Sequence, residues 1–82
     1  MLATIRELIA QNGRLPVAIE TIDNDQDLYA SGLTSFAAVQ LMLAIEDRFD
    51  VEFPESMLNR RSFASVDAIA GCLHAIAALK AA

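Results

Sequence analysis

Residues 32–43 read GLTSFAAVQLML, and within them a loop gives way to a strongly apolar helical pattern at Ser35. At about 100° per residue, this pattern predicts a helix over residues 35–50. Its core face is expected to carry Ala38, Leu41, Met42, Ile45 and Phe49. A second apolar line consists of Phe36, Val39 and Leu43. A helix that buries one face does not need this second line, so either a neighbouring helix or a loop covers it, or it is a docking strip beside Ser35.

Apolar spacing predicts three further helices around this one. Residues 2–12 form a first helix that stops at Gly13. The stripe that this helix is expected to bury is Leu2, Ile5, Leu8 and Ile9. Pro54 suits the first position of a short helix that continues to about residue 59. Ser65 can cap a last helix, with Asp67 in its first turn. The stripe expected to be buried there is Val66, Ile69, Ala70, Leu73, Ile76 and Ala77.

The connection between the first two helices is long, roughly twenty residues, which is uncommon in a small domain unless the loop is packed or functional. Six apolar residues are expected to anchor it over the core: Leu15, Val17, Ile19, Ile22, Leu28 and Leu33. A short helical turn is expected over residues 27–30. The expected fold is therefore all-α, a four-helix bundle of three longer helices and one short one with a long first loop, in a single domain over residues 1–82.

Composition and charge limit the classes of partner. The chain has 82 residues, a net charge of −5 and one cysteine. Nine of its eleven acidic residues lie in one stretch: Glu20, Asp23, Asp25, Asp27, Glu46, Asp47, Asp50, Glu52 and Glu55. Such a surface repels nucleic acid and anionic membranes and attracts basic proteins, although a solvated, solubilising face looks the same. We expect a cytoplasmic protein, because no apolar run reaches membrane-spanning length and the N-terminus lacks the layout of a secretion signal. We also expect a monomer.

The alternating aspartates Asp23, Asp25 and Asp27 resemble the start of a calcium-binding EF-hand loop. That loop also requires a glycine at its sixth position and a glutamate at its twelfth. Leu28 and Thr34 occupy those positions here, so the aspartates are expected to form turns. We expect no metal site.

Ser35 does not have the surroundings of a hydrolase nucleophile. Such a serine has a glycine two residues away on either side, and Leu33 and Ala37 stand there instead. The only histidine, His74, lies on the last helix outside its core stripe, and Cys72 is expected to pack as a small hydrophobic residue. We therefore expect no enzymatic activity.

Ser35 does suit an attached anion. At the first turn of a helix, unpaired amide hydrogens and the positive end of the helix dipole favour a phosphate group. Gly32 provides backbone freedom just before this position. The competing explanation is that Ser35 is an ordinary helix cap, and the residues alone leave both explanations open.

Residues 27–58 read DLYASGLTSFAAVQLMLAIEDRFDVEFPESML and closely resemble the central stretch of acyl carrier proteins. The usual pattern of that family has an acidic residue and a leucine, then Gly-Leu-Asp-Ser-Leu, a helix ending in Glu-Glu-x-Phe, and an Ile-Pro-like step. The matching residues here are Asp27-Leu28, Gly32-Leu33, Ser35, Glu46-Asp47, Phe49 and Phe53-Pro54, without a gap. Helix order and chain length extend the resemblance over essentially the whole chain.

The resemblance implies that Ser35 is the attachment point of a 4′-phosphopantetheine arm, which a phosphopantetheinyl transferase takes from coenzyme A. The arm ends in a thiol that holds an acyl or aminoacyl group as a thioester, and the carrier shuttles this group without catalysis. The implied partners are the transferase, a ligase that loads the acyl or aminoacyl group, and a downstream acceptor enzyme. The implied docking residues are Thr34, Phe36, Val39, Gln40, Leu43, Glu46 and Asp47.

Some positions depart from the family pattern. Thr34 replaces the aspartate that usually precedes the serine, and Arg48 interrupts the acidic end of the helix. Ala37 and Gln40 occupy positions that are often acidic. The interpretation therefore leans toward free-standing carriers that receive amino acids from ligases resembling class II aminoacyl-tRNA synthetases, or toward another specialised pathway. The alternative function is an unmodified helical adaptor that binds partners through its acidic second helix.

Overall fold

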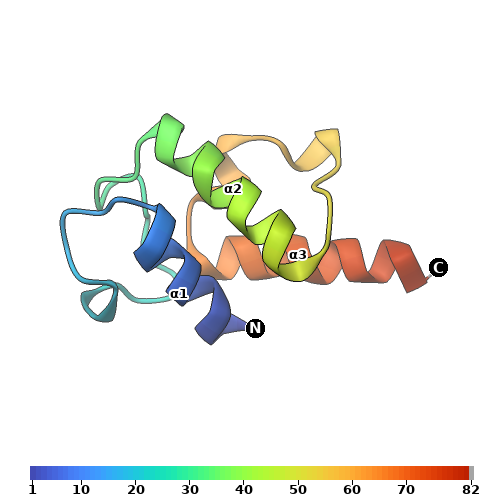
Figure 1. Ribbon diagram of the computed structural model, residues 1–82, viewed down its shortest axis with the longest axis horizontal. Coiled ribbons are helices and arrows are strands. Elements are labelled where there is room, and N and C mark those ends of the chain that lie inside the picture. Colours follow the sequence, from blue (N-terminus) through green and yellow to red (C-terminus); the bar gives the residue numbers. More distant parts are fainter. Residues whose placement is uncertain (82) are drawn as a thin grey trace.

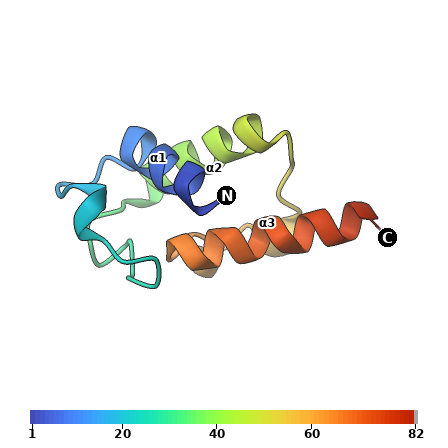
Figure 2. The ribbon, with the colours of Figure 1, turned by 90° about the horizontal axis from the view of Figure 1, so that it is seen from below.

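The computed structural model describes residues 1–81 and contains three α-helices, α1 (Leu2–Asn12), α2 (Ser35–Phe49) and α3 (Val66–Ala81). Short 3-10 helices lie in the connections: η1 (Ile19–Thr21), η2 (Glu55–Met57) and η3 (Arg60–Phe63). In Figure 2, α1 and α2 form one layer and α3 runs below both, and α1 packs against each of the other two. Figure 1 shows the long loop after α1 at the end of the molecule opposite the C-terminus. The all-α prediction is confirmed, since the described residues contain no strand.

The predicted fourth helix is replaced by two short 3-10 helices. The sequence predicts one short helix over residues 54–59, but the chain makes η2 and then η3, separated by Leu58 and Asn59. These two residues leave the helical region, with φ/ψ of −86°/69° and −145°/166°. The Asn59 side chain favours the break, because its Oδ1 accepts a hydrogen bond from the Ser62 amide (3.1 Å) and caps η3. Pro54 is the extended residue before η2 rather than its first helical residue.

The buried faces of α1 and α2 agree with the predicted stripes, with small exceptions. Their buried residues are Ile5, Leu8, Ile9, Ala37, Ala38, Leu41 and Ile45. Met42 and Phe49 are half-buried. Leu2 is wrongly predicted as a core residue and is exposed, because it is the first residue of α1 and lies at the open end of the packing. The second helix ends at Phe49 because Asp50 adopts the left-handed conformation, with φ of 52°.

The start of α3 is as the sequence predicts. The Ser65 hydroxyl accepts a hydrogen bond from the Ala68 amide at 3.0 Å, which caps the helix. The buried residues of α3 are Val66, Ile69, Ala70, Leu73 and Ile76. The prediction for Ala77 is wrong, since this residue is exposed. Ala77 follows the buried Ile76, and at this level of the helix the core covers only the side of α3 that Ile76 faces. In Figure 2, the C-terminal part of α3 extends past the layer that α1 and α2 form.

The long first loop packs against the core through most of the predicted anchors. Ile22, Leu28 and Leu33 are buried, and Leu15 and Ile19 are half-buried. The prediction for Val17 is wrong, because 47% of this residue is exposed. Val17 lies in a bend before η1, which turns its side chain away from the core.

Polar contacts tie the same loop to the helices on both sides. The Arg6 guanidinium of α1 donates a hydrogen bond to Asn24 Oδ1 (2.9 Å). The carbonyl of Asn24 accepts from the Asp67 amide at the start of α3 (2.9 Å), and the Leu28 amide donates to the Ala64 carbonyl (2.7 Å). The loop is therefore held against α1 and α3, which fixes the segment that leads into α2.

The last turn before α2 depends on Asp27 and Gly32. The expected helical turn over residues 27–30 is present as a hydrogen-bonded turn over residues 28–32, and Asp27 Oδ1 accepts from the Tyr29 amide (2.9 Å). Gly32 has a φ of 117°, and a Cβ at this position would lie 2.6 Å from Pro16 Cδ. Only glycine avoids both the backbone strain and this close approach, so the turn directs the chain into α2 in one orientation.

Candidate functional site

Ser35 occupies the first position of α2, and its side chain is exposed. The residue that caps this helix is Thr34, whose Oγ1 accepts a hydrogen bond from the Ala37 amide at 3.0 Å. Thr34 also has the extended backbone of a cap, with φ of −86° and ψ of 162°. The explanation of Ser35 as an ordinary helix cap is therefore wrong. Its hydroxyl is left at the surface, beside the amides of the first helical turn.

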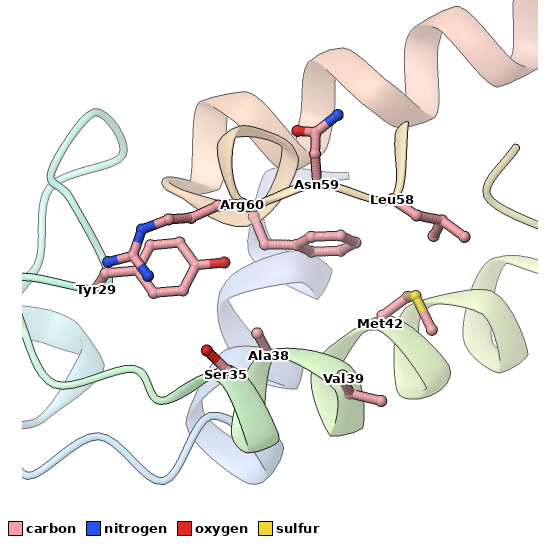
Figure 3. Close-up of a pocket in the computed structure, with 9 residues that line it drawn as sticks. Tyr29, Ser35, Ala38, Val39, Met42, Leu58, Asn59 and Arg60 are labelled. Atoms are coloured by element: carbon pink, nitrogen blue, oxygen red, sulfur yellow. The ribbon is translucent and has the colours of Figure 1, made fainter. Parts of the chain in front are cut away.

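A groove of about 490 Å³ opens beside Ser35. Its lining residues are Tyr29, Ser35, Ala38, Val39, Met42, Leu58, Asn59, Arg60 and Phe63. In Figure 3, side chains of α2 form one wall, and the segment from Leu58 to Arg60 forms the opposite wall. The Ser35 hydroxyl points toward the end where Tyr29 and Arg60 lie, whereas Met42 and Leu58 lie at the other end. The groove thus has a polar end next to Ser35 and an apolar end further along α2.

Arg60 and Tyr29 form the polar end of the groove as a stacked pair. The guanidinium carbon of Arg60 lies 3.8 Å from the centroid of the Tyr29 ring, within the range of a cation–π interaction. Burial raises the pKa of the Tyr29 phenol above its ordinary value of 10.0, the positive charge of Arg60 opposes this rise, and the Asp27 carboxylate adds to it. Tyr29 is therefore uncharged at neutral pH.

The second apolar line of α2 is open to solvent. The exposed fractions are 63% for Phe36, 51% for Val39 and 53% for Leu43, and we call these three residues the α2 apolar stripe. The alternative that a helix or the loop covers them is wrong, because more than half of each residue is exposed. The guanidinium carbon of Arg14 lies 5.8 Å from the centroid of the Phe36 ring. An exposed apolar strip of this kind favours contact with another protein.

The polar residues expected in docking are not equivalent in the structure. Thr34, Gln40 and Asp47 are exposed, and Thr34 is also the helix cap. Glu46 is half-buried, and its Oε2 accepts a hydrogen bond from the Phe53 amide at 2.8 Å. Glu46 therefore has a structural role that the sequence pattern does not reveal.

Five residues of the groove were not identified from the sequence: Tyr29, Leu58, Asn59, Arg60 and Phe63. They come from the loop before α2, from the connection between η2 and η3, and from η3 itself, so no helical spacing relates them to Ser35. The one signal in the sequence is that Arg60 and Arg61 form a basic pair in a chain with a net charge of −5.

Other side chains with reactive groups do not build a second site. Within residues 1–81, no three His, Cys, Asp or Glu side chains are grouped so that they could hold a metal ion. His74 is exposed on α3 and Cys72 is half-buried, and neither lines the groove beside Ser35. Of the helices in the described part of the chain, none has the length and apolar character needed to span a membrane.

The sequence matches a known protein family over most of its length. The family is described as the phosphopantetheine attachment site, and the match covers residues 3–73. The chain belongs to the phosphopantetheine attachment family. Phosphopantetheine is accordingly the cofactor of this domain, which confirms the cofactor that the resemblance to acyl carrier proteins implied.

Members of this phosphopantetheine attachment family include close relatives of the chain. An aminoacyl carrier protein of Agrobacterium fabrum is 61% identical over 69 residues, which cover 84% of this chain and 83% of the relative. A second relative is a carrier protein from Agrobacterium tumefaciens, crystallised with AMP and an engineered Bradyrhizobium japonicum glycine:carrier-protein ligase. It superposes on this chain with a TM-score of 0.88 at 57% sequence identity, and the match covers 90% of this chain and 99% of that one. The predicted leaning toward aminoacyl carriers is confirmed at the level of homology.

A more distant carrier protein shares the same fold. It is found in a crystal structure of the Bradyrhizobium japonicum glycine:carrier-protein ligase complexed with a glycylated carrier protein. The TM-score is 0.74 at 27% identity, over 87% of this chain and 95% of that one. The arrangement of α1, α2 and α3 is therefore retained after much of the sequence has changed.

Proposed function

We propose that this protein holds an aminoacyl group as a thioester on a phosphopantetheine arm attached to Ser35 and passes the group between partner enzymes, with no catalysis of its own. The observation that carries the proposal is the exposed Ser35 hydroxyl at the start of α2, which the Thr34 cap leaves available, in a chain of the phosphopantetheine attachment family. The similarity to an aminoacyl carrier protein supports an aminoacyl cargo over other acyl groups.

The surroundings of Ser35 fit such an arm. The free amides of the first turn of α2 and the positive end of its dipole favour a negatively charged phosphodiester. In the attachment, Ser35 Oγ forms a bond to phosphorus as the pyrophosphate bond of coenzyme A breaks; the adenosine bisphosphate half leaves, and the hydroxyl proton passes to a base of the transferase. When bound, the arm supplies a terminal thiol on which a carboxylic acid is held as a reactive thioester.

The α2 apolar stripe is the proposed docking surface for the partner enzymes. It begins next to Ser35, so a partner that covers it also approaches the arm. The polar residues Thr34, Gln40, Glu46 and Asp47 complete the proposed surface. Carrier proteins similar to this chain are bound to glycine:carrier-protein ligases in solved structures, which supports such a ligase as one partner. The other proposed partners are a phosphopantetheinyl transferase and a downstream acceptor enzyme.

Intact-mass measurement tests the attachment site. Incubation with coenzyme A and a broad-specificity transferase should add the mass of one phosphopantetheine to the wild type and to Ser56→Ala, a control at an exposed serine of η2. Ser35→Ala should keep its helical circular dichroism and gain no mass. Glycine, ATP and a glycine:carrier-protein ligase should then add a glycyl group to the modified proteins alone. A folded wild type that never gains the arm contradicts the proposal.

The exposed α2 apolar stripe also favours a second function, that of an unmodified adaptor. If the protein is an adaptor, the Ser35→Ala variant should still function in the cell, whereas the Leu43→Arg and Asp47→Lys variants should no longer bind the partner. If the protein is a carrier, the Ser35→Ala variant has no arm and holds no thioester, so it should not function in the cell. Complementation with Ser35→Ala in the native host therefore separates the two functions.

A further inference from the structure

We propose that Arg60, stacked on Tyr29, binds the phosphodiester of the arm attached to Ser35 and thereby positions the arm at the polar end of the groove. The inference rests on the proposed attachment at Ser35. It assigns a ligand-positioning role to two residues that the sequence pattern does not single out.

Arg60 is the charged residue of the groove. Of the nine residues that line the groove, Arg60 alone has an ionised side chain at neutral pH. The chain as a whole carries a net charge of −5, and this net charge repels a phosphodiester. A guanidinium can donate two parallel hydrogen bonds to a pair of phosphate oxygens, a match that an ammonium group does not offer. The polar end of the groove is therefore suited to this one anionic group.

The stacked pair lies on the side toward which Ser35 points. Figure 3 shows the Ser35 hydroxyl directed to the end of the groove where the Arg60 guanidinium lies over the Tyr29 ring. A phosphoryl group bonded to Ser35 Oγ therefore begins on that side, between the amides of the first turn of α2 and the guanidinium. The amides alone would favour an anion, and Arg60 adds a full positive charge from the opposite wall.

The structure holds Arg60 in place before any ligand is bound. Asn59, the residue before it, accepts a hydrogen bond from the Ser62 amide (3.1 Å) and donates one to the Ser56 carbonyl (3.1 Å). The Tyr29 ring then covers one face of the guanidinium, at 3.8 Å from its carbon. Stacking uses the face of the ion and leaves the N–H groups at its edge able to donate. Part of the side-chain entropy that binding costs a free arginine is therefore already lost.

A purely structural role is the competing explanation for the pair. In that case the stack of Arg60 on Tyr29 would only hold the loop before α2 against η3, and its energy would be the same with and without the arm. The two explanations therefore differ in one quantity, which is the coupling between Arg60 and the modification of Ser35.

A double-mutant cycle measures this coupling. Urea unfolding is followed for the apo and the mass-verified holo forms of the wild type, Arg60→Met and Arg61→Met. The control, Arg61, is an exposed neighbour that does not line the groove. We expect attachment of the arm to shift the unfolding equilibrium toward the folded state about two- to fivefold more in the wild type and Arg61→Met than in Arg60→Met, the range of an exposed ion pair. Equal apo–holo differences in all three proteins overturn the inference.

Side-chain nitrogen NMR of the wild type gives an independent measurement that needs no variant to fold. The Arg60 Nε–H signal should move between the apo and holo forms, and the Arg61 signal should not. A signal of Arg60 that stays in place overturns the inference as well. If the proposed attachment at Ser35 is wrong, the holo form never appears in the mass spectrum. That outcome is distinct from a holo form whose stability and Arg60 signal do not depend on the arm.

Discussion

Glu46 Oε2 accepts a hydrogen bond from the backbone amide of Phe53 at 2.8 Å, which ties the last turns of α2 to the loop that follows. Glu46 is half-buried, whereas the neighbouring Asp47 is exposed. The two adjacent carboxylates therefore have different roles in the free protein. One holds a loop in place, and the other faces solvent, where a partner can reach it.

Substitutions at these two acidic residues should separate stability from docking. Glu46→Ala leaves the amide of the buried Phe53 without its acceptor and should lower the free energy of unfolding by about 1–2 kcal/mol. Asp47→Ala removes an exposed charge and should change it by less than about 0.5 kcal/mol. Urea denaturation of both variants measures the difference. Equal stability of the two variants would show that the bond to Phe53 contributes nothing.

Thr34 should contribute to stability as the cap of α2, and Ser35 should not. Thr34→Val removes the acceptor of the Ala37 amide and should cost about 1 kcal/mol, which corresponds to a fall of roughly 4–8 °C in Tm. Thr34→Ser keeps a hydroxyl at the cap and should restore most of the loss. Thermal unfolding by circular dichroism is the measurement. If Ser35→Ala were more destabilising than Thr34→Val, the assignment of the cap would be wrong.

The α2 apolar stripe should matter for loading and little for folding. Phe36→Ala and Leu43→Ala remove exposed side chains, so stability should change by less than about 0.5 kcal/mol. If a ligase buries these side chains, kcat/KM for loading should fall roughly tenfold with each substitution. Leu79→Ala is the matched control, because Leu79 is an equally large leucine side chain on α3 and is 65% exposed. Unchanged loading by all three variants would exclude the stripe as the docking surface.

The salt dependence of the association rate should show how much Asp47 contributes to binding a basic partner. Raising the ionic strength screens exposed charges over a Debye length of about 10 Å at 0.1 M salt. The association rate with the ligase should therefore fall, and Asp47→Asn should show a weaker dependence on salt than the wild type. Stopped-flow association at several salt concentrations tests this. Identical salt dependence in the two proteins would leave Asp47 without a role in docking.

Stability should depend on alkaline pH through Tyr29. Its pKa in the folded protein lies above the ordinary 10.0 of the unfolded chain, mainly because of burial. The contribution to stability is complete below pH 10 and is lost as the pH rises from that value through the folded pKa, because the unfolded chain releases its proton first. Tyr29→Phe should remove this dependence. Tyr29 is the one tyrosine of the chain, so the absorbance of tyrosinate also reports its pKa directly. If the folded protein titrates at the ordinary value of 10.0, the raised pKa of Tyr29 is contradicted.

Much of the helical fold could be predicted because helices are local structures. Apolar spacing placed α1 and α2 within one residue of their observed ends, and the Ser65 cap placed the start of α3. The errors concern residues whose burial depends on distant neighbours. Leu2 and Ala77 have the right spacing for a core stripe, but both are exposed in the folded chain. The short predicted helix failed for a local reason, the competition of the Asn59 side chain with the backbone.

The candidate site was only partly visible in the sequence. Thr34 and Ser35 are both good caps by residue type, and the choice between them depends on which residue has the extended backbone just before the helix. The sequence also left open whether the α2 apolar stripe is exposed. Residue spacing defines one face of a helix, but it does not tell whether another element covers that face, and the structure shows that the stripe is exposed.

Periodicity and a short motif were therefore sufficient for the three α-helices, for the position of Ser35 at the start of α2 and for the assignment to carrier proteins, because each of these features lies within a few neighbouring residues. The cap at Thr34, the hydrogen bond from Phe53 to Glu46 and the stack of Arg60 on Tyr29 were decided by the folded chain alone. The physical reason is that backbone geometry sets the helical period locally, whereas contacts between separate segments exist only after the turns and the core have brought those segments together.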